Sequence, residues 1–105
     1  MTDRDYILKK VKSTVCSFDK SAGIILYGSR AKGTASADSD WDFLILTEDD
    51  YDYNKKREIK RALHHIEIET GEVISVIIHS TNYWNSEKNA VTPFYKNVVE
   101  VSITL

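Results

Sequence analysis

Two short apolar runs, separated by a polar segment with two glycines, constrain this 105-residue chain most strongly. The runs are Ile24–Tyr27 and Phe43–Leu46, and turn-favouring residues lie next to both. Short apolar runs bounded by turn residues are typical of buried strands. The segment between them therefore connects two strands of one sheet, where a loop can present polar side chains at the ends of those strands.

The connecting segment begins with Gly28 and Ser29, a pair suited to contact a bound anion. Glycine lets the backbone adopt a positive φ or approach a ligand closely, and a serine hydroxyl can donate to a phosphate oxygen. Arg30 to Lys32 suit a short helix, and Gly33 suits its end. Because N–H groups at a helix start favour anions, the segment predicts a phosphate cradle with positive charge close by. A glycine–serine turn on its own is more typical of an ordinary structural turn.

Asp40 and Asp42 follow, separated by Trp41. Residues two apart on a strand project from the same face, so both carboxylates point one way and Trp41 points into the core. Partly desolvated carboxylates repel each other, and a divalent cation removes that penalty. Carboxylates and substrate phosphates together suit Mg²⁺, and two such ions can flank an in-line phosphoryl transfer. The alternative for this stretch alone is a polar turn with a solvated Asp40.

Together these features resemble the signature of the nucleotidyltransferase superfamily that includes DNA polymerase beta. The signature is a glycine–serine turn, a short helix, a glycine and then Ser-Asp-x-Asp. The small size of the chain is similar to that of the minimal bacterial and archaeal members, the MNT domains. The resemblance is specific between Ile24 and Leu46, and over most of the remaining chain it rests on the order of helices and strands.

The resemblance implies a reaction and a site. Members of the superfamily transfer a nucleoside monophosphate from an NTP to a hydroxyl or similar acceptor and release pyrophosphate. For this chain it implies transfer of AMP from ATP, with Asp40 and Asp42 as catalytic ligands of one or two Mg²⁺ ions. It also implies that Gly28 and Ser29 bind the triphosphate, and Arg30 is expected to assist them. The preferred base and the acceptor stay open, and a partner protein is one candidate acceptor.

Many minimal members pair with a HEPN-domain protein as antitoxin and toxin, and some adenylylate that partner. The resemblance therefore implies a second function, an antitoxin-like binding module that caps a HEPN-type partner while its own site is reduced or inactive. The family's third carboxylate, which helps hold the metal and takes the proton from the attacking hydroxyl, bears on this choice. Ser75 lies at the matching position here, and Glu67, Glu69 and Glu72 lie just upstream as alternative sources.

The whole pattern predicts one α/β (α+β) domain over residues 1–105, with a small mixed sheet and flanking helices. Expected helices run from a cap at Thr2 or Asp3 to about Ser17, from about Tyr53 to Glu69, after Ser80 or Thr81, and from Thr92–Pro93. Expected strands are Ile24–Tyr27, Trp41–Leu46 and Val73–His79. The tail from Val101 to Leu105 suits either a short strand or an extended docking segment.

Composition limits the partners. With 14 Lys and Arg against 16 Asp and Glu, the chain lacks the basic excess of nucleic-acid-binding domains, so nucleic acid is not expected as a direct partner. A basic group between residues 55 and 61 is expected on a solvated helix face. Cys16 is the only cysteine, so no internal disulfide can form and a cytoplasmic location fits. No run of residues is apolar enough to predict a membrane span.

Overall fold

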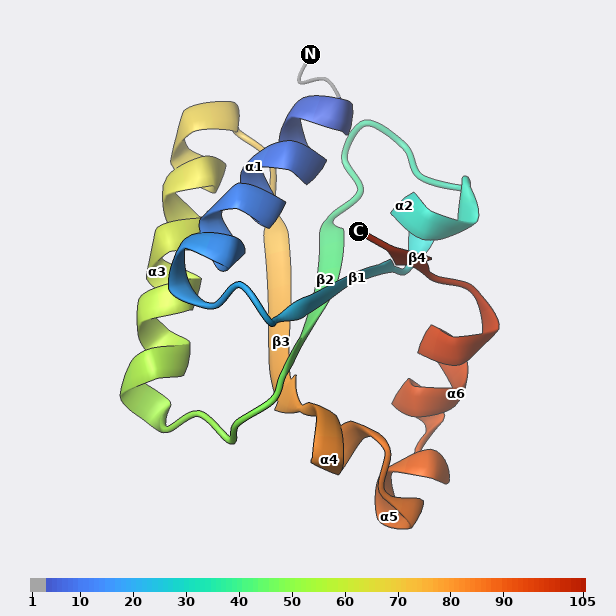
Figure 1. The fold of residues 1–105 in the computed structure, drawn as a ribbon. Coiled ribbons are helices and arrows are strands. Elements are labelled where there is room, and N and C mark those ends of the chain that lie inside the picture. The colour runs from blue at the N-terminus through green and yellow to red at the C-terminus, as the bar shows by residue number, and fades with distance from the viewer. Residues whose placement is uncertain (1–3) are drawn as a thin grey trace.

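The computed structural model describes residues 4–105, which form a four-stranded sheet with six helices around it (Figure 1). The helices are α1 (Arg4–Phe18), α2 (Ser29–Lys32), α3 (Tyr53–Thr70), α4 (Thr81–Trp84), α5 (Glu87–Ala90) and α6 (Pro93–Glu100). The strands are β1 (Gly23–Tyr27), β2 (Trp41–Thr47), β3 (Ile74–Ser80) and β4 (Ile103–Thr104). The predicted α/β architecture is therefore confirmed. None of the helices in this range is both long and apolar enough to cross a membrane.

The sheet is mixed, with the strand order β3-β2-β1-β4. β1 pairs antiparallel with β2 and with β4, whereas β2 and β3 are parallel. A parallel pair needs a long crossover, and α3 supplies it. The register places Asp42 of β2 opposite Tyr27 of β1 and next to Ser75 of β3. These three side chains form one row across the sheet. In the tail, the strand alternative is the correct one, because β4 pairs with β1.

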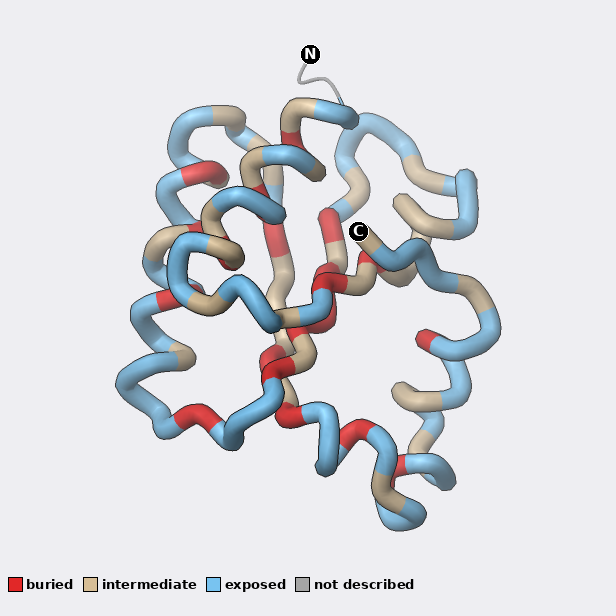
Figure 2. Tube along the Cα trace, in the orientation of Figure 1, coloured by how far each residue is buried: buried red, intermediate tan, exposed pale blue. Residues whose placement is uncertain are grey.

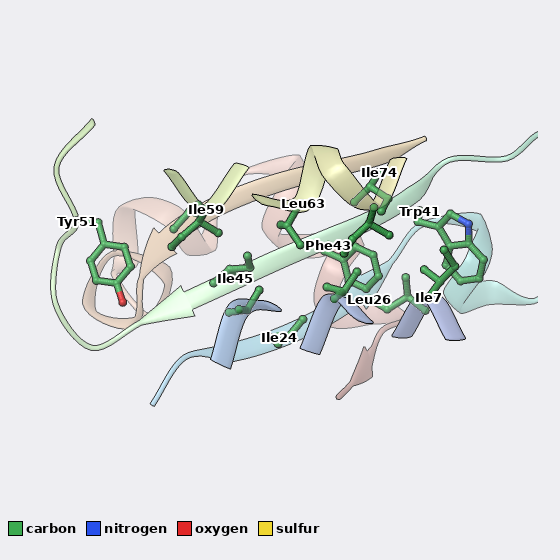
Figure 3. Close-up of a cluster of buried hydrophobic side chains, with 14 residues drawn as sticks. Ile7, Ile24, Leu26, Trp41, Phe43, Ile45, Tyr51, Ile59, Leu63 and Ile74 are labelled. Carbon is green, nitrogen blue, oxygen red and sulfur yellow. The ribbon is translucent and has the colours of Figure 1, made fainter. Parts of the chain in front are cut away.

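One face of the sheet is covered by α1 and α3, which lie side by side over it (Figure 1). Buried residues lie along the strands and on the sides of these helices that face them (Figure 2). Ile7, Val11 and Val15 of α1 are fully buried, as the helical spacing predicts. Phe43 of β2 lies in the middle of this cluster, close to Leu63 of α3 (Figure 3). Trp41 belongs to the same cluster and is 2% exposed.

The other face is covered by the smaller helices α4 and α6, and its cluster of fully buried side chains is smaller. Leu44, Trp84 and Val98 form that cluster. The Trp84 ring packs 5.8 Å from the ring of Phe94 and 4.9 Å from that of Tyr95, centroid to centroid. Trp84 therefore packs a helix on the sheet.

The helix ends follow local capping chemistry. Asp52 begins α3, because its carboxylate accepts the N–H of Lys55 at 2.8 Å. Gly33 and Gly71 end α2 and α3 in the left-handed conformation, with φ of 79° and 75°. The cap predicted at Thr2 or Asp3 lies outside the described residues.

Several element ends differ from the sequence-based expectation by one residue, and one short helix was not predicted. β3 begins at Ile74 rather than Val73, which is 52% exposed and lies outside the ladder. The helix α5 was not predicted, because four residues are too few to show a periodic pattern. Its start is set by Ser86, whose hydroxyl accepts the N–H of Asn89 at 3.2 Å.

Candidate functional site

Gly28 lies directly against the carboxylate of Asp42. Since the β1–β2 register sets Tyr27 opposite Asp42, the residue that follows β1 lies beside the start of β2. Gly28 has φ 74° and ψ −160°, and a Cβ built on it would lie 2.4 Å from Oδ2 of Asp42. Only glycine fits both the dihedral angles and the contact. The structure thus brings the predicted turn and one of the predicted carboxylates together.

The short helix α2 begins immediately after Gly28. The carbonyl of Gly28 accepts the N–H groups of Ala31 at 3.0 Å and Lys32 at 3.1 Å. The N–H groups of Ser29 and Arg30 therefore lie at the free start of the helix, where an intrahelical partner is missing. N–H groups in this position suit an anionic group held next to Asp42.

The two aspartates form a carboxylate pair. Asp42 is half-buried and Asp40 is exposed. Burial, and then the neighbouring charge of Asp40, raise the pKa of Asp42 above its usual value. No hydrogen bond or ion pair from residues 4–105 neutralises either carboxylate. The pair therefore favours a cation, and its hard oxygen donors suit Mg²⁺ shared with phosphate oxygens.

The third strand contributes a hydroxyl at the position beside Asp42. The parallel register pairs Asp42 with Ser75, so the two side chains lie next to each other on one face. Across the part of the chain that the structure describes, no group of three or more His, Cys, Asp and Glu side chains could hold a metal ion. The protein's own donors at this place are the carboxylate pair and the serine.

The three glutamates upstream of Ser75 all have other contacts. Glu67 accepts the N–H of Ile74 at 2.8 Å, Glu69 accepts the hydroxyl of Tyr6, and Glu72 accepts the indole N–H of Trp41 at 3.3 Å. Tyr6 belongs to α1 and Trp41 points into the core beneath α1 and α3, so these contacts lie on the face opposite Asp42. In this structure Ser75, and none of these three glutamates, is therefore the side chain that lies beside Asp42.

The side chain of Arg30 lies away from Asp42, contrary to the expectation that it points at phosphate. Its Cζ is 4.2 Å from the centroid of the Trp41 ring, and its Nη2 donates to the carbonyl of Ser39 at 2.9 Å. Because Trp41 and Asp42 project from opposite faces of β2, the guanidinium is held on the far side. The indole face and the loop carbonyl attract the planar cation, and only the backbone N–H of Arg30 is left on the Gly28 side.

A cavity of about 230 Å³ adjoins the turn. It is lined by Tyr27, Gly28, Lys32, Phe94 and Asn97. Lys32, one of the two basic residues expected near the turn, therefore brings a positive charge close to Gly28. A larger hollow of about 460 Å³ lies along α1 and includes no residue of this site. Nothing in the local pattern of α6 signals that Phe94 and Asn97 line a cavity with Gly28, because they reach it only through tertiary packing.

Comparisons with known proteins bear on this arrangement. Residues 8–103 match the profile of a family described as "Nucleotidyltransferase domain". Over 77 residues the chain is 36% identical to "Putative protein adenylyltransferase MJ0604" of Methanocaldococcus jannaschii. That alignment covers 73% of this chain and 70% of the relative.

Solved structures share the fold. One described as a "putative minimal nucleotidyltransferase" has a TM-score of 0.65 at 20% identity, covering 99% of this chain and 97% of the other. A toxin–antitoxin MntA–HpeT structure has a TM-score of 0.61 at 17% identity, covering 98% and 72%. A toxin–antitoxin structure with AMP-PNP has a TM-score of 0.54 at 17% identity, covering 89% and 70%. At these identities the likeness concerns the fold alone.

Proposed function

We propose that this chain, which belongs to the nucleotidyltransferase domain family, is a Mg²⁺-dependent enzyme that transfers AMP from ATP to a hydroxyl group. The acceptor we favour is a side chain of a partner protein, since the relative from Methanocaldococcus jannaschii is named a protein adenylyltransferase. The lone Cys16 suits a protein of the reducing cytoplasm, and we place the activity there.

The contact between Gly28 and Asp42 carries this proposal. It joins a turn with free N–H groups to a carboxylate that no cation among residues 4–105 neutralises. A triphosphate needs N–H donors and positive charge, whereas the carboxylates need a cation. A Mg²⁺–nucleotide complex meets both needs at one place, whereas neither Mg²⁺ nor the nucleotide alone does.

In this proposal, the turn and Lys32 bind the phosphates, and the two aspartates bind the metal. The N–H groups of Ser29 and Arg30, with the hydroxyl of Ser29, bind and orient the β- and γ-phosphates. Lys32 adds positive charge from the cavity beside Gly28. Bound between Asp40 and Asp42, one or two Mg²⁺ ions would neutralise the charge that develops on the transferred phosphoryl group. Catalysis then rests on positioning and electrostatic stabilisation.

The reaction also requires that a group accept the proton of the acceptor hydroxyl. The acceptor oxygen bonds to the α-phosphorus, the bond to the β-phosphate oxygen breaks, and pyrophosphate leaves. The acceptor hydroxyl loses its proton, which the hydroxyl of Ser75 takes up poorly because serine is a weak base. The proton therefore passes to solvent or to a carboxylate of the pair, and we expect slow turnover.

The experiment that tests the site is a calorimetric titration of the chain with each NTP, with and without Mg²⁺. We expect ATP to bind only with Mg²⁺, and Asp42→Asn to weaken that binding beyond detection at about 1 mM, a free energy of about 4 kcal/mol. A matched variant on the exposed face of α3, Glu58→Gln, should bind as the parent does. An Asp42→Asn protein that binds Mg²⁺–ATP normally would show that the site has been assigned wrongly.

The second candidate is an antitoxin-like module whose main work is to cap a HEPN-type partner. Ser75 favours it, because a site without a third carboxylate binds nucleotide more readily than it turns it over. Toxin–antitoxin proteins among the structural relatives agree in fold with such a role. Absence of nucleotide binding in the titration, in a folded parent protein, would favour this candidate over the enzyme.

A further inference from the structure

Asp40 lies just before β2, outside the hydrogen-bonded ladder, and is exposed. A metal ligand in such a place needs its backbone held by other contacts, because a site loses affinity when its ligands are not fixed. The loop of residues 34–40 has a local turn of its own, in which Ser39 donates its N–H to the carbonyl of Ser36 at 3.1 Å. That turn is exposed, and it does not by itself fix the position of Asp40.

Arg30 holds the residue immediately before Asp40. Its Nη2 donates to the carbonyl of Ser39 at 2.9 Å and to that of Ala37 at 3.5 Å. The side chain of Arg30 is only 15% exposed, so these charge-assisted bonds are formed away from bulk water. The end of the loop is thereby tied to α2.

Trp41, the residue immediately after Asp40, is held by Glu72 and by the backbone of Val73. The indole N–H of Trp41 donates to Oε2 of Glu72 at 3.3 Å, and the backbone N–H of Trp41 donates to the carbonyl of Val73 at 2.9 Å. The same Oε2 lies 3.7 Å from Nη2 of Arg30, whose guanidinium covers the Trp41 ring. Arg30, Trp41 and Glu72 thus form one closed cluster, which we call the clamp, with contacts on both sides of Asp40.

Packing alone does not explain an arginine here. Nε of Arg30 is buried without a hydrogen-bond partner, and a buried unsatisfied donor costs free energy. A methionine could cover the Trp41 ring without that cost. What an apolar side chain could not do is bind the loop carbonyl and Glu72 together.

We propose that Arg30 is a positioning residue that fixes Asp40 for metal binding, with Trp41 and Glu72 as the other members of the clamp. This inference rests on the proposed function, because it takes Asp40 as a metal ligand. It gives the side chain of Arg30 a role on the opposite face of β2, while its backbone N–H stays with the phosphates.

The test compares the parent chain with Arg30→Lys, which keeps the charge but loses the planar fork, and with Glu72→Gln. Three quantities are measured: the affinity for Mn²⁺–ATP by paramagnetic resonance of free Mn²⁺, the amide hydrogen exchange of residues 36–41 without metal, and the urea midpoint. Arg57→Lys, on the exposed surface of α3, is the matched control.

For Arg30→Lys we expect about tenfold weaker Mn²⁺–ATP binding, typical for loss of a group that supports a metal ligand. We also expect clearly faster exchange at residues 36–41, with a urea midpoint close to that of the parent. Glu72→Gln should change the Mn²⁺–ATP affinity and the exchange of residues 36–41 in the same direction as Arg30→Lys, and by less. A lowered urea midpoint with unchanged Mn²⁺ affinity would mean a purely structural clamp and overturn the proposal.

The failure of this inference can be told apart from that of the function. A parent chain that binds no Mn²⁺–ATP overturns the proposed function and the positioning role with it. A parent that binds, together with an Arg30→Lys protein that binds equally well, overturns the positioning role alone. Unchanged exchange at residues 36–41 in both clamp variants would also contradict it.

Discussion

The two faces of the sheet differ in how completely they are covered. The face beneath α1 and α3 holds a cluster of fourteen buried residues, whereas the face beneath α4 and α6 holds three. On the second face the row of Tyr27, Asp42 and Ser75 is only partly covered. Neighbouring residues of β2 alternate between these environments, so one strand serves both the core and the site.

The difference teaches how so short a chain can hold a charged site. Uncompensated carboxylates cost free energy when buried, and a small domain has little stability to lose. Confining the large cluster to one face leaves the other open enough for Asp40 and Asp42 to stay partly hydrated. The clamp extends the well-packed face to the edge of the site, where Trp41 and Asp42 are adjacent in sequence.

The largest expected effect tests the covered face. Phe43→Ala should lower the free energy of unfolding by about 3–5 kcal/mol, because Phe43 is completely buried between α1 and α3. Leu44→Ala, at the next residue and on the other face, should cost about 2–3 kcal/mol, the lower part of the range for leucine. Urea unfolding followed by circular dichroism measures both. Equal losses of the free energy of unfolding would contradict the difference between the two faces.

Two glycine substitutions test the contact between the turn at Gly28 and the carboxylate of Asp42. Gly28 and Gly33 both have a positive φ, but only Gly28 has Asp42 where a Cβ would lie. Each change to alanine should cost about 1–2 kcal/mol from the dihedral angles, and Gly28→Ala more because of the clash. Gly28→Ala should also weaken Mg²⁺–ATP binding at least about tenfold, a change of 1.4 kcal/mol or more.

Gly33→Ala is the control for that experiment, because nothing lies within 4 Å of its Cβ position. It should lose stability and keep nucleotide affinity in calorimetry. A Gly33→Ala protein that loses affinity as Gly28→Ala does would show that the helix end, rather than the carboxylate contact, controls binding.

Ser75→Asp tests whether the open face lacks one carboxylate for catalysis. The register places the new carboxylate beside Asp42, so it can bind metal and take the acceptor proton. We expect release of pyrophosphate to rise about tenfold or more, still below the range of 10²–10⁴ typical of a full general base. Ser75→Asn, of similar size and without the charge, should give no gain. A folded Ser75→Asp protein with no gain would indicate that another group already takes the proton.

The smallest expected effect is the pH dependence that Asp42 gives to the metal-free chain. Its pKa is raised in the folded state by burial and by Asp40, so the folded state favours the protonated form. Its contribution to stability is therefore present below the unfolded pKa and is lost as the pH rises through the folded one. Asp42→Asn should match the parent near pH 3 and become slightly more stable than it at pH 7. A variant less stable at pH 7 than the parent would contradict this sign.

Much of the fold could be predicted because its signals are local. The helical spacing of Ile59, Leu63 and Ile66 predicts their burial, and all three are buried. The motif between Ile24 and Leu46 led to the family, which the comparisons confirm. Trp41 points into the core as the alternation of a strand requires.

What could not be predicted depends on contacts between distant segments. Arg30 and Lys32 lie in one turn of helix, and nothing in that turn says which of them a tryptophan ring on β2 will attract. The place of Ser75 beside Asp42 depends on the register of a parallel pair joined through α3, and alternation alone does not set it. The metal-binding and nucleotide-binding roles of Asp40, Asp42, Gly28 and Ser29 stay predictions.

β4, the shortest strand, makes its edge of the sheet the mechanically weaker one. β4 has two exposed residues, yet it pairs with Ile25 and Leu26 of β1, just ahead of Gly28. Under a pulling force applied at Leu105, the few hydrogen bonds of β4 would rupture first, while the longer pairing of β1 with β2 still carries load. A tether placed there would thus peel away one edge of the sheet before disturbing the contact between Gly28 and Asp42.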